Sequence, residues 1–420
     1  MALTFLFYYR RIKFLADWER NGVMAKLKRE ADKKVLNKSE GSWIKRHRAE
    51  CITILFILGF MISVLIWNRG IQDKYQHYNN TNITYEKGIV TEVKNDGLTV
   101  DETDSGRYLG LQYANIRILS GKYKGRIVET DNYLTASNNI YVEAGTRVIV
   151  SQDEPEDTEP YFVIYNYYRS PAVYGILLVF AFFMMLIGGR KGLRAILGLA
   201  FTLFVIVMWM IPVIYLGYSP VMASVAAVVI TTTAALLLLN GASKKTLAAI
   251  CGTALGVVLV GVIFALFAAV LHVSGYNTDE TEFMVLISQN THLQIAEVLF
   301  AGVLIASLGA VMDVGMSIAS AIFEVQNANP QLSRRELFRS GVNIGKDMIG
   351  TMSNTLILAF TGSGLSTLLV LTGYGIKYHQ LVSSDFLAIE LGQGLSGTIA
   401  VILTVPVTSA AASVLYKRTK

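Results

Sequence analysis

Long apolar runs separated by short polar connections account for most of the chain. A helix needs about 20 mostly apolar residues to cross the roughly 30 Å of hydrocarbon in a membrane. Eight runs reach or approach this length, and the first of them is the shortest. They predict membrane-spanning helices near residues 51–67, 171–188, 194–216, 220–240, 246–272, 296–324, 350–373 and 386–415.

The segment 68–170, between the first two predicted spans, has a different pattern. Short runs rich in Val, Ile, Thr and Tyr alternate there with turn residues, which is typical of β-strands. Asn95-Asp96-Gly97 carries a hairpin-turn signal, so we expect one strand to end and another to begin there. The predicted strands cover residues 88–93, 98–100, 109–119, 121–128, 145–150 and 161–167. Five or six such strands are enough for a small closed or half-open barrel.

Composition agrees with a membrane protein. Hydrophobic residues make up 53% of the 420 residues and charged residues only 16%, with a mean hydropathy of +0.45. Soluble domains carry about 25% charged residues. We therefore expect a mostly α, polytopic membrane protein with about eight transmembrane helices and a small extracytoplasmic β-barrel-like domain. Its main partner is then the lipid bilayer.

The excess positive charge is concentrated at the N-terminus. Residues 1–50 hold 13 Lys and Arg against 6 Asp and Glu, within a net charge of +6 for the whole chain. This uneven distribution is typical of the cytoplasmic flank of a span, so no nucleic-acid partner is expected. The apolar residues of this segment recur at helical spacing. They predict an amphipathic helix at the membrane surface, with a partner-binding helix as the alternative.

Basic residues also predict the sidedness of the spans. Twelve of the 13 Lys and Arg beyond residue 170 fall in alternate connections, and Lys377 is the exception. By the positive-inside rule, both termini are cytoplasmic and residues 68–170 are extracytoplasmic. The expected organisation is a basic segment, a first transmembrane helix, a β domain and a seven-helix membrane domain. These regions cover residues 1–50, 51–67, 68–170 and 171–420.

Asp313 is the most informative polar residue, because it lies near the middle of the predicted span 296–324. A carboxylate at that depth costs roughly 2.5 to 3.5 kcal/mol, and such residues usually face a protein interior or a water-filled cavity. Ser317, Ser320 and Glu324 follow at intervals that place all four on one helix face. This stripe would end on the cytoplasmic side at Glu324. For the serines, simple helix packing is the alternative.

The last two predicted spans add further polar candidates. Thr351 and Asn354 share one face of the span 350–373. Ser363 lies in the run Thr361-Gly-Ser-Gly364, which interrupts the apolar pattern of that span halfway. Transporters bind ions or substrates at such breaks, although glycine is also common in uninterrupted membrane helices. Glu390, in the outer half of the last span, is placed to pair with the span 350–373 or to guard an outer entrance.

The connection before the span 350–373 contains a helix start. Ser333 and Glu336 have the spacing of a capping box, and Leu332 and Leu337 that of a hydrophobic staple. They predict a cytoplasmic helix beginning near Arg334, ahead of the span itself.

Several kinds of chemistry have no sequence support. Cys51 and Cys251 both lie at or inside predicted spans, so we interpret them as packing residues rather than a disulfide. The chain has no Cys/His spacing for a metal, no Walker motif and no His-Glu-x-x-His, Gly-x-Gly-Asp or Gly-x-Ser-x-Gly motif. We therefore expect no metal, no cofactor, no catalytic residues and no enzymatic activity.

Two long segments resemble the signature sequences of the YibE/F-like bacterial membrane proteins. They are Gly309–Ala321 and Gly345–Leu356, and Tyr168–Pro171 and Gly188–Leu193 also look like parts of that family. The resemblance covers roughly residues 85–415 and implies a bacterial multi-span protein of the cell membrane, without supplying a reaction. The positions that match the family segments are Asp313, Ser317, Gly350, Thr351 and Asn354.

Two functional hypotheses follow. The first is a secondary transporter or permease for an unknown small substrate, coupled to H⁺ or Na⁺. Its candidate ion- or substrate-binding residues are Asp313, Ser317, Thr351, Asn354, Ser363 and Glu390. The second is a non-transporting scaffold or sensor whose extracytoplasmic β domain binds an envelope or membrane protein. An intramembrane enzyme is a third and weaker alternative, because the motifs named above are absent.

Overall fold

The structure is a computed structural model that describes residues 52–71, 83–102, 106–155 and 159–416. The predictions for the basic segment 1–50 and for Cys51 fall outside these residues. The chain divides into two compact units, one formed by Gln76–Gly192 and the other by Met1–Tyr75 together with Leu193–Lys420. Each unit is described by itself.

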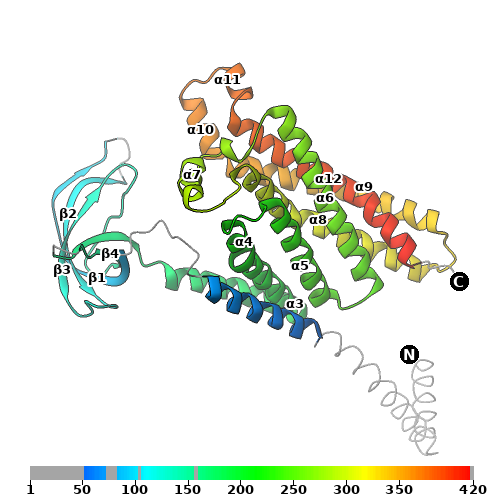
Figure 1. Cartoon of the computed structure of the whole chain (residues 1–420), viewed down its shortest axis with the longest axis horizontal. Coiled ribbons are helices and arrows are strands. Elements are labelled where there is room, and N and C mark those ends of the chain that lie inside the picture. The colour runs from blue at the N-terminus through cyan, green and yellow to red at the C-terminus, as the bar shows by residue number, and fades with distance from the viewer. Residues whose placement is uncertain (1–51, 72–82, 103–105, 156–158, 417–420) are drawn as a thin grey trace, which may run out of the picture. The chain divides into compact units, whose positions relative to one another are not determined.

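The first unit contains one antiparallel sheet with the strand order β3-β2-β1-β4-β5 (Figure 1). The Thr130 hydroxyl of edge strand β3 donates to the Phe162 carbonyl of edge strand β5 over 2.7 Å. The sheet therefore curls until its edges meet, which confirms the predicted barrel-like domain as a half-barrel. Its strands are β1 (Ile83–Val100), β2 (Tyr108–Ile118), β3 (Ile127–Leu134), β4 (Arg147–Asp153) and β5 (Tyr161–Tyr167).

The hairpin predicted at Asn95-Asp96-Gly97 is wrong, because β1 continues through these residues. Strand β2 pairs with β1 on both sides of them, and a register shift between Lys94 and Gly97 absorbs one extra residue as a bulge. The Asn95 side chain accepts a hydrogen bond of 2.8 Å from Gln112 Nε2. Pairing along the whole of β2 therefore keeps β1 extended through residues whose local sequence favours a turn.

A short segment without strand structure closes the half-barrel through side-chain hydrogen bonds. The Gln112 amide binds both backbone groups of Val142, with Nε2 donating over 3.0 Å and Oε1 accepting over 3.1 Å. Its cross-strand neighbour Asn132 donates to the Ile140 carbonyl over 2.8 Å. The Gln112 amide is fully engaged, and together the two buried amides hold residues 140–142 over the core as a strand partner would.

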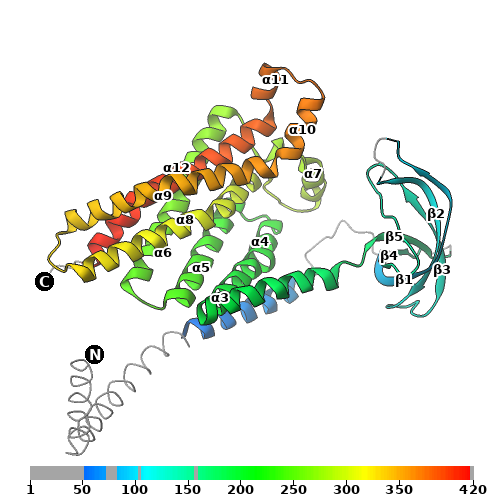
Figure 2. The ribbon, with the colours of Figure 1, turned by 180° about the vertical axis from the view of Figure 1, so that it is seen from behind.

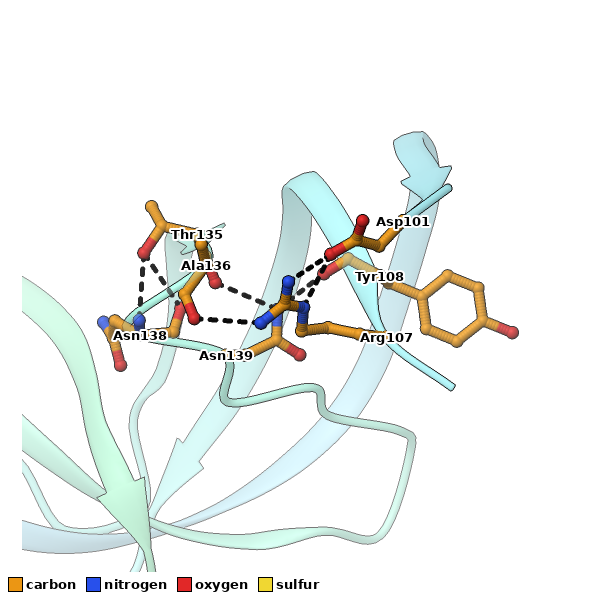
Figure 3. Close-up of polar contacts among 7 residues, drawn as sticks. All are labelled: Asp101, Arg107, Tyr108, Thr135, Ala136, Asn138 and Asn139. Atoms are coloured by element: carbon orange, nitrogen blue, oxygen red, sulfur yellow. Dashed lines mark hydrogen bonds and ion pairs between the residues drawn. The ribbon is translucent and has the colours of Figure 1, made fainter. Parts of the chain in front are cut away.

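The neighbouring loop is held by Arg107 (Figure 3). Its Nε and Nη2 both donate to Asp101 Oδ2, Nε over 2.7 Å, and its Nη1 donates to the Ala136 carbonyl over 3.2 Å. Asn139 donates to the Tyr108 carbonyl over 2.6 Å. The Asp101 side chain is only 7% exposed. The ion pair therefore helps to compensate for burying that carboxylate.

The second unit is helical. Six helices of the described residues are long and apolar enough to cross a membrane, and the bent pair α9 and α10 makes a seventh candidate. The large exposed apolar side chains of these helices suit contact with lipid. The helices are Ile52–Ile71, α3 (Ser170–Val205, shared by the two units), α4 (Ile211–Tyr215), α5 (Pro220–Asn240), α6 (Lys244–Leu271), α7 (Thr281–Asn290), α8 (Ile295–Ala328), α9 (Arg334–Ser363), α10 (Leu365–Gly373), α11 (Tyr378–Val382) and α12 (Asp385–Tyr416).

The predicted spans 171–188 and 194–216 fall in one helical stretch, Ser170–Tyr215, of 46 residues. A straight helix of that length would measure about 69 Å, more than twice the thickness of the hydrocarbon. It is not continuous, because Gly189 has φ 52° and ψ −131°. A Cβ on Gly192 would overlap the carbonyl oxygen of Met184, although residues so far apart in sequence never meet along one straight helix. The chain therefore folds back at Gly189, while the count of eight spans stays a prediction.

Helices α6, α8, α9 and α12 lie side by side and form the main core (Figures 1 and 2). Close packing rests on hydroxyl side chains set against glycines of neighbouring helices. A Cβ on Gly252 of α6 would overlap Thr408 Oγ1 of α12, so only glycine fits there. The same relation joins Gly256 with Thr404, Gly315 with Thr253 and Gly397 with Ser307. Small residues at such contacts let membrane helices approach closely.

Helix α9 begins as predicted. Glu336 N donates to Ser333 Oγ over 3.3 Å, and Ser333 N donates to the Glu336 carboxylate over 2.7 Å. These two bonds complete the capping box. The helix then continues without a break into the predicted span and ends at Ser363. No proline or helix-breaking turn lies between Arg334 and the apolar part of the helix, so one helix serves both segments.

Candidate functional site

The polar stripe of α8 faces outward from the helical unit. Asp313, Ser317 and Glu324 are exposed, and Ser320 accepts a hydrogen bond of 3.3 Å from Lys245 Nζ. Within the described residues, Asp313 forms no hydrogen bond or ion pair. The exposed face continues toward the start of α8 through small residues, namely Gly302, Ala306 and Gly309.

The candidates on α9 are exposed as well. The Thr351 hydroxyl donates to the Met348 carbonyl over 3.0 Å, and Ser363 donates to the Phe360 carbonyl over 2.7 Å. Both hydroxyls are therefore engaged within their own helix. The Asn354 amide has no protein partner among the described residues. Neither Asp313 nor Asn354 lines either of the two pockets described next.

The first pocket lies where the chain bends between α9 and α10. The two helices are separated only by Gly364 and meet at 53°. The pocket has a volume of about 100 Å³ and lies against the first turns of α12. Its lining is largely apolar: Ile357, Phe360, Thr361, Gly364, Leu368, Phe386, Leu387, Glu390, Leu391, Gly394 and Leu395.

Gly364 permits the close approach of α12 to this bend. A Cβ at residue 364 would lie 2.6 Å from Phe386 Cζ and 3.6 Å from the carboxyl carbon of Glu390. The φ of Gly364 is −85°, so the need for glycine is steric rather than conformational. The interruption predicted at residues 361–364 is therefore a bend between two helices, and its glycine seats side chains of α12.

Glu390 gives the pocket its chemistry. One carboxylate oxygen, Oε2, is buried and has no hydrogen-bond partner in the described part of the chain. A buried acceptor without a partner is costly and is usually explained by a bound group or by a functional role. The only other side-chain oxygen in the lining is the Thr361 hydroxyl. The bend thus offers one negative or proton-accepting group in apolar surroundings.

The second pocket, of about 530 Å³, is more open and lies beside Glu297. The Glu297 carboxylate accepts hydrogen bonds from the Ser219 hydroxyl and from Val221 N, the latter over 3.4 Å. Ser219 is the N-cap of α5, so Glu297 stabilises the start of that helix in addition to its own position in the first turn of α8. Its Oε2 is engaged in structure, whereas the buried Oε2 of Glu390 is not, which favours Glu390 as the functional carboxylate.

The structure thus brings together Glu390 and the break that contains Ser363, but it leaves Asp313, Ser317, Thr351 and Asn354 on outward faces. Sequence reasoning missed Phe386 and Phe360 as parts of the site. The signal available for them was their position: Phe360 directly precedes the interruption at residues 361–364, and Phe386 lies one helical turn before Glu390. Within the described residues, no group of three or more His, Cys, Asp or Glu could hold a metal ion.

Comparison with known proteins assigns the helical part of the chain to a family. The sequence pattern of the family described as YibE/F-like protein matches residues 176–418, more than half of the chain. The half-barrel lies outside this match, whereas the sequence resemblance extended from about residue 85. No curated protein and no solved structure matches the chain. The apolar helices are those of an integral membrane protein, and the chain belongs to the YibE/F-like family.

Proposed function

We propose that this protein is a secondary transporter or permease whose binding site is the pocket at the α9–α10 bend. The observation that carries the proposal is the buried, unpartnered oxygen of Glu390 beside Gly364. Discontinuous membrane helices with a polar group at the break are a recurring way to build transport sites. A carboxylate in apolar surroundings favours a proton or another cation.

The sidedness predicted by the basic residues completes the proposal. With both termini in the cytoplasm of a bacterial cell, α12 begins on the outer side, so Glu390 lies in the outer half of the membrane. The half-barrel is then extracytoplasmic. The energy for transport comes from an H⁺ or Na⁺ gradient, and Glu390 is the group that binds the coupling ion or a charged substrate. Asp313 stays the second candidate for ion coupling.

Flux through proteoliposomes tests the proposal. Full-length protein is reconstituted, and ²²Na⁺ uptake and proton movement are measured under imposed Na⁺ and pH gradients. Wild-type vesicles should move at least one of these ions faster than protein-free vesicles, and Glu390→Gln should return the rate to that of protein-free vesicles. Glu324→Gln, which neutralises an exposed acid at the other end of the unit, is the matched control. Full flux in Glu390→Gln would overturn the assignment.

The same assay separates the two carboxylates. Asp313→Asn removes no hydrogen bond within the described residues, so the variant should fold normally. Loss of flux in Asp313→Asn would support ion coupling at Asp313, and unchanged flux would remove that role and leave Glu390.

A second candidate function is a non-transporting scaffold or sensor. The exposed α8 face favours it, because a carboxylate among small residues suits contact with another protein chain better than contact with lipid. Deleting residues 85–165 distinguishes the two functions. The scaffold is favoured if the deletion abolishes recovery of a bound partner protein and the intact protein shows no ion flux. Flux that depends on Glu390 favours the transporter.

A further inference from the structure

The pocket at the α9–α10 bend has a composition that distinguishes between classes of cation. Its lining offers two side-chain oxygen groups, the Glu390 carboxylate and the Thr361 hydroxyl. The Phe360 carbonyl, at the bend itself, already accepts from Gly364 N over 3.1 Å and from Ser363 Oγ over 2.7 Å. The divalent cations Ca²⁺ and Mg²⁺ prefer a shell of six or more oxygen ligands, and these groups do not provide one.

Aromatic and aliphatic groups make up the rest of the lining. The ring edge of Phe386 lies against Gly364, beside the Glu390 carboxyl group, and the Phe360 ring lies 3.7 Å from the Cβ position of Gly394. Aromatic and aliphatic walls beside a carboxylate suit a cation whose charge is spread over methyl or methylene groups, because such a cation is weakly hydrated. The same walls do not provide polar groups that could replace the water around a strongly hydrated ion.

The size of the pocket sets a limit on the ligand. Its volume is about 100 Å³. This is the space of about three liquid water molecules. A pocket of this volume suits a cation with a single small centre better than a nucleotide or a peptide.

From this combination we propose that the bend pocket binds a small organic cation of the methylated-ammonium class, with Glu390 as its counter-ion and Phe386 and Phe360 as its aromatic walls. The proposal rests on the transporter function and names the substrate class of that site. Glu390 binds the positive centre, the rings contact its methyl groups, and Gly364 leaves room for both.

Equilibrium binding of radiolabelled tetramethylammonium to the purified full-length protein in detergent tests the proposal. Saturable binding is expected for wild type, with at least a tenfold loss of affinity in Glu390→Gln. Phe386→Leu should weaken binding about three- to tenfold, because it removes the ring while keeping an apolar side chain. Glu324→Gln should bind as wild type does. Size-exclusion profiles and thermal unfolding report whether each variant is folded.

Competitors give the outcomes that decide between ligand classes. Excess unlabelled tetramethylammonium should displace the label, while tert-butanol, similar in shape but uncharged, should not. If Na⁺ binds with dependence on Glu390 and tetramethylammonium does not, the organic-cation class is overturned and the transporter proposal stands. Tetramethylammonium binding that is equal in wild type and Glu390→Gln also overturns the assignment. Glu390-dependent binding without any flux in proteoliposomes contradicts the transporter and supports the binding site alone.

Discussion

The carboxyl carbon of Glu390 on α12 lies only 3.6 Å from the position that a Cβ would occupy at Gly364, the residue between α9 and α10. Phe386, one helical turn before Glu390, approaches the same position to 2.6 Å. The position of the carboxylate therefore depends on the bend, because the missing side chain of Gly364 makes room for both residues of α12.

Gly364→Ala should disturb the pocket without unfolding the protein. The added methyl group collides with the Phe386 ring, which must rotate or move α12 outward. Overpacking of this kind costs about 1 to 3 kcal/mol. We expect a lower unfolding temperature together with a marked loss of ion flux. Gly362→Ala, two residues earlier and with open space at its Cβ, is the control. Equal flux in the two variants would contradict the geometry.

The glycine contacts of the core give a prediction about stability. A Cβ on Gly315 meets one close atom, Thr253 Oγ1 at 2.9 Å, while a Cβ on Gly309 of the same helix meets nothing within 4 Å. Gly315→Ala should therefore destabilise by about 1 to 2 kcal/mol. Gly309→Ala should be neutral or slightly stabilising, because alanine favours a helix.

Thermal unfolding of the purified protein compares the two alanine variants. Adding Thr253→Ala to Gly315→Ala removes the close atom, so the double variant should recover part of the loss, and a double-mutant cycle measures this coupling. The helix packing would be wrong if Gly309→Ala were the more damaging change.

In the half-barrel, Arg107→Ala should destabilise the loop around Ala136. The change leaves the buried Asp101 carboxylate without its ion pair. The expected cost is about 1 to 3 kcal/mol. Faster hydrogen exchange at residues 106–118 and 134–142 of the intact protein is the expected result. The exposed pair Lys122–Glu154 provides the control, because Lys122→Ala should leave exchange in these segments unchanged.

Tyr167 gives the half-barrel a dependence on alkaline pH. Burial raises the pKa of the Tyr167 phenol, whose hydroxyl donates to the Tyr141 carbonyl over 2.6 Å. The folded state therefore keeps a proton that the unfolded chain releases above about pH 10. Stability from this group is complete below that pH and declines as the pH rises through the raised pKa. Tyr167→Phe should lose stability at pH 8 but fall less than wild type between pH 8 and 11. If wild type and Tyr167→Phe lost hydrogen-exchange protection equally between pH 8 and 11, this role would be excluded.

Much of the fold follows from local sequence patterns. Apolar length placed the helices α5, α6, α8 and α12 to within a few residues, and the Ser333 and Glu336 spacing marked the start of α9. Tertiary pairing decided the rest. At Asn95 a strong turn signal was overruled because β2 pairs with β1 on both sides of it. The predicted span began at residue 350, whereas one helix runs from Arg334 to Ser363, because apolar length marks the membrane part and not the polar first half of α9.

The site was less predictable for a physical reason. Asp313 was selected because a charge in an apolar run is costly, but that cost does not say which neighbour the residue faces. The buried positions Val311, Val314 and Ile318 show which side of α8 packs inward, and Asp313 lies on the other side. The sequence did place Glu390 opposite the span 350–373. That it lies against Gly364, at the bend itself, becomes visible only in the folded chain.

Covalent labelling of Glu390 tests the central claim most directly. Dicyclohexylcarbodiimide reacts with carboxyl groups in apolar surroundings, and mass spectrometry of the intact, reconstituted protein locates the modified residue. We expect modification at Glu390, slowed by tetramethylammonium, with little modification of Glu297, whose carboxylate is already hydrogen-bonded. Absence of labelling at Glu390, or labelling that neither tetramethylammonium nor Na⁺ slows, would contradict a cation site at the bend.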